Sequence, residues 1–576
     1  MASLLALPPL MPVDDIERGQ RGVCKTVFEG DLIEEFEFSV KGVMKSFLGP
    51  GKDLVLIRLE GEKPEFTGVV AGMSGSPCVI DGKLVGALAY AFAAFAKEPI
   101  AGITPMKDML EVMRQPSAPR PWRLDQAALD KDEASWDRLA KQSFGPRPSE
   151  NEELRPIATP LSVSGFHPAV RDYFFPWLEE QGFEPVASGH APRGGKSKEQ
   201  SLQPGSAVAA VLVKGDVNIA ATGTVTSVEK NEVLAFGHPF MGTGILSVPM
   251  AHATILNTMV SQRRSFKMSQ TGEIIGEVTQ DRLPAIGGLL GPAPAMIPVE
   301  GEVRTPFKES TFNFQVARDH SMSPRFVAMG IANSLTGAVD TSGRGTLRLE
   351  GRVEAKGLEP ITLQRVFSSQ RDPRLMIQAA IAMARTVGTL WGTPFGAPPD
   401  LKLTLRATLE SQPIVEWVEE MNLDRSLAHA GDVLTVSAKI RREDGPVRTE
   451  SFEITIPSSW GNQVITLFVT NAQYAQMIAE QAGGIPRPVT LGQVGQWLRE
   501  QRPDGYLYLT AVRKGIGIRS QVDVLPLIPP SMATLLSAGS SKSASPIGVA
   551  WEERKPVPGM LLGGTAKILK VLPKGK

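Results

Sequence analysis

The sequence predicts a mainly β protein with two barrel-like units, followed by an α+β segment and a β-sandwich. Residues 11–113 alternate apolar and polar side chains or form short buried runs, which Gly, Pro and an Asp-Gly pair interrupt. Residues 205–308 are rich in Val, Thr and Ile, with turn residues between the runs. Residues 413–470 alternate in paired runs, which is typical of a small sandwich of immunoglobulin-like type.

The remaining segments are less regular. Residues 114–204 are rich in Pro and charged side chains and predict a connector with one helix. Residues 309–412 mix strand patterns with one clear helix, which defines the α+β segment. Residues 471–576 predict helices followed by a low-complexity tail that is rich in Gly, Ser and Pro.

Composition excludes some classes of partner. The chain has 576 residues, enough for several domains, and its 42% hydrophobic and 21% charged residues are ordinary for a soluble globular protein. Lys and Arg total 61, as do Asp and Glu, so no overall field favours nucleic acid or an acidic membrane. The longest interior apolar run, residues 85–96, is too short for a transmembrane span.

The N-terminus and the cysteines bear on location. Residues 2–11 are apolar and follow no basic segment, so they resemble either the end of a truncated signal peptide or a frayed apolar terminus. Cys24 and Cys78 lie far apart and have no nearby His, which argues against a zinc site. They form either one disulfide in an oxidising compartment or two buried thiols.

The sharpest motif is Gly-Met-Ser-Gly-Ser-Pro at residues 72–77, between two strand patterns. A serine hydroxyl becomes a good nucleophile when a tight turn exposes it beside a base and near oxyanion donors. The flanking glycines permit such a turn. We therefore predict Ser74 as a nucleophile, with the N–H groups of Gly72 and Ser74 as the oxyanion hole. The alternative is a Gly- and Ser-rich hairpin turn without chemistry.

A longer resemblance supports the catalytic interpretation. Chymotrypsin-like peptidases present their serine in the same Gly-x-Ser-Gly-x-Pro context. Residues 22–113 resemble the C-terminal half of the SpoIVB peptidase domain through "GDLIEEFEFSVKGV", "TGVVAGMSGSP", "DGKLVGAL" and "ITPMKDML". In that family the first serine of the motif is the nucleophile, which implies Ser74, and Ser76 matches the non-catalytic second serine. The last segment predicts a short helix with Thr104 at its N-cap.

The base must come from outside the Ser74 unit, which contains none of the six histidines. The segment "ATGTVTSVEKNEVLAFGHPF" resembles the strand-turn-strand that leads to the family's catalytic Gly-His pair, which implies His238 as general base. The alternative is a buried histidine that is hydrogen-bonded to backbone ahead of Pro239. His252 is a second candidate, although its apolar neighbours favour a core histidine.

The sequence departs from the family in two ways. In the family the histidine half precedes the serine half, whereas here Ser74 precedes His238, so the order is permuted. A triad is defined by geometry and not by chain order, so two docked barrels could still form one. The family also has an aspartate about fifteen residues before the serine. Here Glu60 is the nearest carboxylate and Asp53 lies earlier, and each is alternatively an ordinary solvated side chain.

The resemblance implies a hydrolase: a serine endopeptidase that works through an acyl-enzyme without metal or cofactor. Family members act outside the cytoplasm, so the expected location is secreted or periplasmic, in the bacterial envelope. The partners would be protein or peptide substrates, and the sequence contains no signal for an oligomeric state. The competing hypothesis is an inactive envelope scaffold or binding protein that retains the peptidase fold.

Overall fold

The computed structural model divides the chain into two compact units. One unit comprises residues 1–298 and 313–333, and the other comprises residues 299–312 and 334–576. The structure describes residues 8–92, 97–115, 154–188, 201–319, 322–339, 344–370, 374–393, 395–443, 445–483, 488–520, 523–525, 529, 531–532, 534–535 and 544–573. The segment predicted as the end of a signal peptide therefore lies largely outside the described residues.

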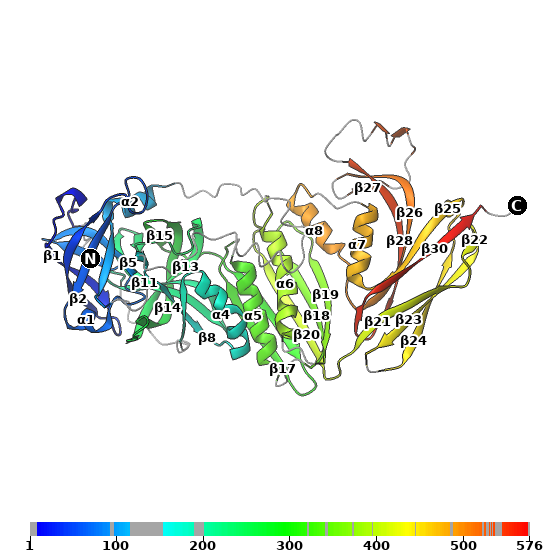
Figure 1. Ribbon diagram of the computed structural model, residues 1–576, viewed down its shortest axis with the longest axis horizontal. Coiled ribbons are helices and arrows are strands. Elements are labelled where there is room, and N and C mark those ends of the chain that lie inside the picture. Colours follow the sequence, from blue (N-terminus) through cyan, green and yellow to red (C-terminus); the bar gives the residue numbers. More distant parts are fainter. Residues whose placement is uncertain are drawn as a thin grey trace. The chain divides into compact units, whose positions relative to one another are not determined.

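The first barrel of unit 1 closes because β4 pairs with both β1 and β5, which completes the ring β4-β1-β2-β3-β6-β5. Figure 1 shows β1 and β2 of this barrel in blue. Its strands are β1 (Arg21–Val27), β2 (Ile33–Met44), β3 (Leu54–Glu60), β4 (Pro77–Ile80), β5 (Lys83–Phe92) and β6 (Ile100–Pro105). Alternation along β2 shows why the ring forms. Phe36, Phe38 and Val40 are buried in the barrel core, whereas Glu35 and Glu37 face solvent.

Short helices flank this barrel. They are η1 (Val13–Asp15), α1 (Glu62–Thr67) and α2 (Met106–Arg114). The predicted cap of α2 is wrong, because Pro105 occupies the N-cap position and no side chain caps the helix. The Thr104 hydroxyl bonds instead to the carbonyl oxygen of Gly237, in the second barrel. The Thr104 hydroxyl therefore donates to a distant carbonyl group and accepts no N–H group of α2.

The second barrel of unit 1 closes in the same way, because β10 pairs with both β11 and β13 and completes the ring β10-β13-β14-β15-β12-β11. Its strands are β10 (Ala207–Gly215), β11 (Asn218–Glu229), β12 (Glu232–Ala235), β13 (Gly244–Met259), β14 (Phe266–Arg282) and β15 (Ala285–Leu290). The end of β17 (Glu309–Val316) pairs with β10. The two closed rings confirm the predicted pair of barrel-like units and agree with a chymotrypsin-like fold.

The described part of the predicted connector adds strands to both barrels as well as containing the expected helix. The helix is α4 (Pro168–Glu180), and His167 caps it by accepting the N–H of Ala169. β7 (Leu154–Pro156) pairs with β5, and β8 (Thr159–Ser164) pairs with β11 and with β9 (Phe183–Ala187). The connector therefore adds strands to the sheet of each barrel.

Unit 2 contains most of the predicted α+β segment and a β-sandwich, whereas residues 313–333 of that segment belong to unit 1. The first has the sheet order β19-β18-β20-β16, and the sandwich has the sheets β24-β23-β21-β29 and β22-β30-β25-β26-β27, with β28 beside β26. The bounds are β16 (Ile297–Arg304), α5 (Ser323–Gly337), β18 (Gly345–Glu354), β19 (Ile361–Ser369), α6 (Leu375–Trp391), β20 (Lys402–Glu410), β21 (Val415–Leu423), β22 (Leu427–His429), β23 (Val433–Arg442), β24 (Val447–Thr455), η3 (Ser458–Trp460), β25 (Gln463–Thr470), α7 (Ala472–Gly483), α8 (Leu491–Arg499), β26 (Tyr506–Ser520), β27 (Asp523–Leu525), β28 (Ala544–Pro556), β29 (Met560–Leu562) and β30 (Gly564–Leu572).

The strands near the C-terminus of the chain belong to the sandwich. The sequence pattern predicted a tail after the helices of residues 471–576, but strands β26 to β30 follow α7 and α8 and complete both sheets. β25 pairs with both β26 and β30, and side chains from all three share the sandwich core. These strands are stabilised by partners far away in sequence, which a local pattern rich in Gly, Ser and Pro does not reveal.

Candidate active site

The predicted nucleophile lies in a tight turn between α1 and β4, residues 71–76, called the nucleophile turn below. Gly72 and Gly75 have φ angles of +97° and +96°, a region that side chains disfavour. A Cβ added to Gly75 would lie 1.9 Å from the carbonyl oxygen of Thr224 in β11, so glycine is also required for close packing. Ser74 is buried at 0% exposure, contrary to the expected exposed hydroxyl, because the second barrel covers the turn.

Two backbone amides in this turn differ from their neighbours. Within the described part of the chain, the N–H groups of Gly72 and Ser74 donate no hydrogen bond. The adjacent amides all donate: Ala71 to Ser265, Met73 to Val70, Gly75 to Leu88 and Ser76 to Met73. Buried N–H groups without an acceptor are rare in folded proteins. These are the two amides that the sequence predicted as oxyanion donors.

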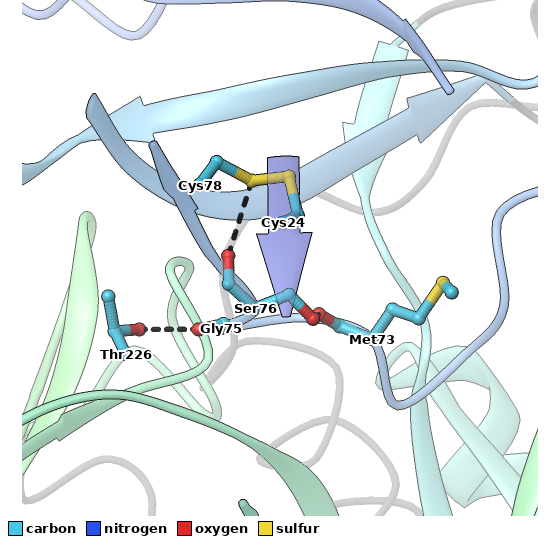
Figure 2. Close-up of a disulfide and its surroundings, with 6 residues drawn as sticks. All are labelled: Cys24, Met73, Gly75, Ser76, Cys78 and Thr226. Atoms are coloured by element: carbon cyan, nitrogen blue, oxygen red, sulfur yellow. Dashed lines mark hydrogen bonds between the residues drawn. A yellow bond between two sulfur atoms is a disulfide. The ribbon is translucent and has the colours of Figure 1, made fainter. Parts of the chain in front are cut away.

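The second barrel holds the turn through two threonines of β11. Thr224 donates its N–H to the carbonyl oxygen of Ser74 (2.8 Å) and its hydroxyl to that of Gly72 (2.9 Å). The hydroxyl of Thr226 donates to the carbonyl oxygen of Gly75 (2.7 Å; Figure 2). Three carbonyl groups of the turn are therefore fixed by the barrel that carries His238.

His238 follows a constrained turn after β12. Phe236 and Gly237 both have φ angles of +70°, which is unusual for a bulky residue such as Phe236. A Cβ on Gly237 would lie 2.9 Å from the Cβ atoms of Ala87 and Ala89 in β5. Constrained backbone of this kind clusters at functional sites. The His238 turn thus packs on the barrel that carries Ser74.

The imidazole of His238 is buried, at 2% exposure. Its Nδ1 lies 2.8 Å from the carbonyl oxygen of Pro239, which can only accept, so Nδ1 carries the proton and Nε2 has a lone pair. Burial lowers the pKa of His238 to about 4, so the ring is neutral at pH 7. Neither Nε2 nor the Ser74 hydroxyl has a hydrogen-bond partner among the residues that the structure describes.

Comparison with known proteins addresses the barrel that carries Ser74. Residues 8–106 match a known peptidase family. The matching family is SpoIVB peptidase S55. The matched segment, called the S55 segment below, includes β1 to β6 and the nucleophile turn. No curated protein and no solved structure matches the chain.

Both predicted third triad members lie in the S55 segment, but they contact other groups. Asp53 accepts the N–H of Ser46 (2.9 Å) and pairs with Lys45 (3.1 Å), and the Ser46 bond lowers the pKa of the carboxyl. Oε2 of Glu60 lies 3.8 Å from Nη2 of Arg21. Among the described residues, His238 makes no hydrogen bond with a carboxylate. Glu60 and Asp53 therefore remain predictions.

The sequence did not single out Asp281, which anchors the loop after His238. This buried carboxylate accepts the N–H groups of Phe240 (2.7 Å), Met241 (2.7 Å) and Thr243 (3.3 Å). Burial raises the pKa of Asp281, and these hydrogen bonds oppose that rise. Strand β14 carries no local signal for it, because the neighbours Gln280 and Arg282 are also polar.

Lys267 is a second buried group that the sequence did not single out. It is 0% exposed, and its stem would lie 3.1 Å from a Cβ added to Gly72. Its Nζ donates to the hydroxyl of Thr26 (2.7 Å), which lies 3.4 Å from that of Thr224. Burial lowers the pKa of Lys267 to about 7. A polar chain thus connects this amine to the nucleophile turn.

A disulfide joins Cys24 of β1 to Cys78 of β4 (Figure 2). This resolves the two alternatives that the sequence left open. Both cysteines are fully buried, and Sγ of Cys78 lies 3.5 Å from the carbonyl oxygen of Ser76. The disulfide therefore fixes the strand that leaves the nucleophile turn.

The other candidates contribute little. His252 lies within β13, opposite Val208 of β10, and burial lowers its pKa. Among the described residues, no cluster of His, Cys, Asp and Glu could hold a metal ion. No helix in the described ranges combines the length and apolar character required to cross a bilayer.

Proposed function

We propose that this protein is a serine endopeptidase of the SpoIVB type that hydrolyses peptide bonds through an acyl-enzyme. The Ser74 hydroxyl attacks the substrate carbonyl carbon while its proton passes to Nε2 of His238. The amides of Gly72 and Ser74 stabilise the resulting oxyanion. His238 then protonates the leaving amine, and water hydrolyses the ester by the reverse route.

One observation carries this proposal: the unpaired amides of Gly72 and Ser74 in the turn of the S55 segment. A turn without chemistry gains nothing from two buried donors without acceptors, since each costs about 1–3 kcal/mol. In a peptidase these donors have no acceptor in the resting site and stabilise the negative charge that develops in the transition state.

His238 suits the role of base by its tautomer. The Pro239 carbonyl, and not a carboxylate, fixes the proton on Nδ1 in this state, and Nε2 is the acceptor that the reaction requires. The burial of Ser74 means that a substrate must first open the site. Pro160 of β8 is part of the cover, since its Cγ would lie 3.1 Å from a Cβ added to Gly72.

The proposed location is outside the cytoplasm, either secreted or periplasmic. The Cys24–Cys78 disulfide supports this location, because such bonds persist in oxidising compartments. Proteins or peptides would be the substrates, as for other peptidases of the family.

The test is covalent labelling with a fluorophosphonate probe, which forms a bond between phosphorus and Oγ as fluoride leaves. We expect the labelled peptide to contain Ser74 and the Ser74→Ala variant to remain unlabelled. Because the Ser74 hydroxyl has no hydrogen-bond partner among the described residues, the free energy of unfolding of the variant should differ from that of the parent by less than about 1 kcal/mol. Equal protein cleavage by variant and parent would exclude Ser74 as the nucleophile.

The competing function is an inactive scaffold that retains the peptidase fold. The contact between Nδ1 of His238 and Pro239 favours it, since a buried structural histidine would make the same contact. The Glu60→Gln and Asp53→Asn variants complete this comparison. If a labelled parent loses its reactivity in one of them, that carboxylate is the third triad member. A parent that neither labels at Ser74 nor cleaves any protein supports the scaffold.

A further inference from the structure

Ser76 makes two hydrogen bonds to one atom of the nucleophile turn. Its hydroxyl donates to the carbonyl oxygen of Met73 at 2.6 Å (Figure 2), and its N–H donates to the same oxygen at 3.0 Å. Ser76 is 0% exposed, so water does not compete for either bond. The carbonyl group of Met73 therefore has a fixed direction.

That carbonyl group belongs to the same peptide unit as the N–H of Ser74. A peptide unit is planar and trans, so its C=O and N–H point in opposite directions. Fixing the Met73 oxygen therefore fixes the direction of the Ser74 N–H. Donation to the oxygen also polarises the amide and strengthens its N–H as a donor, by about 10–30% in condensed-phase estimates.

The other unpaired amide is held differently. The N–H of Gly72 shares its peptide unit with the carbonyl group of Ala71, which accepts the backbone N–H of Lys267 at 3.0 Å. No side-chain substitution removes that bond. The direction of the Ser74 N–H, in contrast, depends in part on the Ser76 hydroxyl. One side chain therefore controls one of the two proposed oxyanion donors.

We propose that Ser76 is a positioning residue for the oxyanion hole, and that its hydroxyl aims the Ser74 N–H at the developing charge. This inference rests on the proposed peptidase function and deepens it. The second serine of the motif, which the sequence marked as non-catalytic, then acts on the reaction through the Met73 carbonyl group without touching substrate.

Ser76→Ala tests the proposal, because the variant loses the hydroxyl but keeps the backbone bond to Met73. A peptide substrate binds before an oxyanion exists, so KM should change little while kcat falls about 10-fold to 100-fold, less than for loss of a whole donor. The rate of fluorophosphonate labelling should fall in parallel. Ser76→Thr retains the hydroxyl and should recover most of the rate.

Thr258→Val is the matched control. It removes another hydroxyl-to-carbonyl bond of 2.6 Å, from Thr258 of β13 to Phe28, but neither residue belongs to the nucleophile turn. We expect Thr258→Val to lower the unfolding temperature as Ser76→Ala does, with kcat near that of the parent.

The outcomes separate the two proposals. A parent that never labels at Ser74 sinks the peptidase function and this inference with it. A labelled parent with an unchanged kcat in Ser76→Ala overturns the inference alone. An equal loss in Thr258→Val also overturns it, since the effect would then follow from a general loss of stability. If Ser76→Ala does not fold, Ser76→Gly removes the same hydroxyl and is judged in the same way.

Discussion

The hydroxyl of Thr104, at the end of β6, donates a 2.6 Å hydrogen bond to the carbonyl oxygen of Gly237. Thr104 is fully buried, and Gly237 directly precedes His238. The bond therefore crosses from the S55 segment to the turn that holds the proposed base.

We expect Thr104→Val to lower the free energy of unfolding by about 1–3 kcal/mol, because the Gly237 carbonyl group loses a buried donor. Valine has nearly the same shape, so packing should persist. Calorimetry measures the stability, and fluorophosphonate labelling of Ser74 reports on the placement of His238. Unchanged stability and labelling would show that the bond contributes nothing.

Asp281 should be among the residues most sensitive to substitution in the second barrel. Asp281→Ala leaves the N–H groups of Phe240, Met241 and Thr243 without their acceptor, and we expect a loss of about 2–4 kcal/mol. Asp281→Asn keeps one oxygen acceptor and should lose less. Hydrogen exchange of residues 240–243 checks the mechanism, since these amides should exchange faster in the alanine variant. Equal exchange in both variants would contradict it.

Lys267 should make the stability depend on pH. Its folded pKa of about 7 is lower than the ordinary unfolded value of about 10.4, so above pH 7 the unfolded chain binds the additional proton and stability rises with pH. From pH 6 to pH 9 the rise attributable to this group should be on the order of 3 kcal/mol. Lys267→Met should remove it and be most stabilising at pH 6. A stability difference that is the same at both pH values would refute this assignment.

The sandwich should be dispensable for the chemistry. A chain that ends near residue 410 lacks both sandwich sheets but keeps all of unit 1 and the strand β20. We expect Ser74 in this shortened chain to label with fluorophosphonate at the parent's rate. If a folded shortened chain does not label, the C-terminal region contributes to the site.

The sequence predicted the two barrels because alternation along strands such as β2 is a local property, with Phe36 and Phe38 facing inward and Glu37 facing outward. It predicted the nucleophile turn because positive φ angles leave a signature of glycines. It did not predict the Thr104–Gly237 bond or the burial of Ser74, since both arise from docking of distant segments. Lys267 escaped notice for the same reason, because burial of a lysine by tertiary packing leaves no local pattern.

The contacts of Thr224 with Gly72 and Ser74 have a consequence for biosynthesis. The S55 segment leaves the ribosome before β11 and His238 are synthesised, and domains generally fold from the N-terminal end during translation. During that interval the nucleophile turn lacks both its hydrogen bonds from Thr224 and its proposed base. We therefore expect the nascent first barrel to be inert, so that no neighbouring chain is cleaved before the second barrel has folded against it.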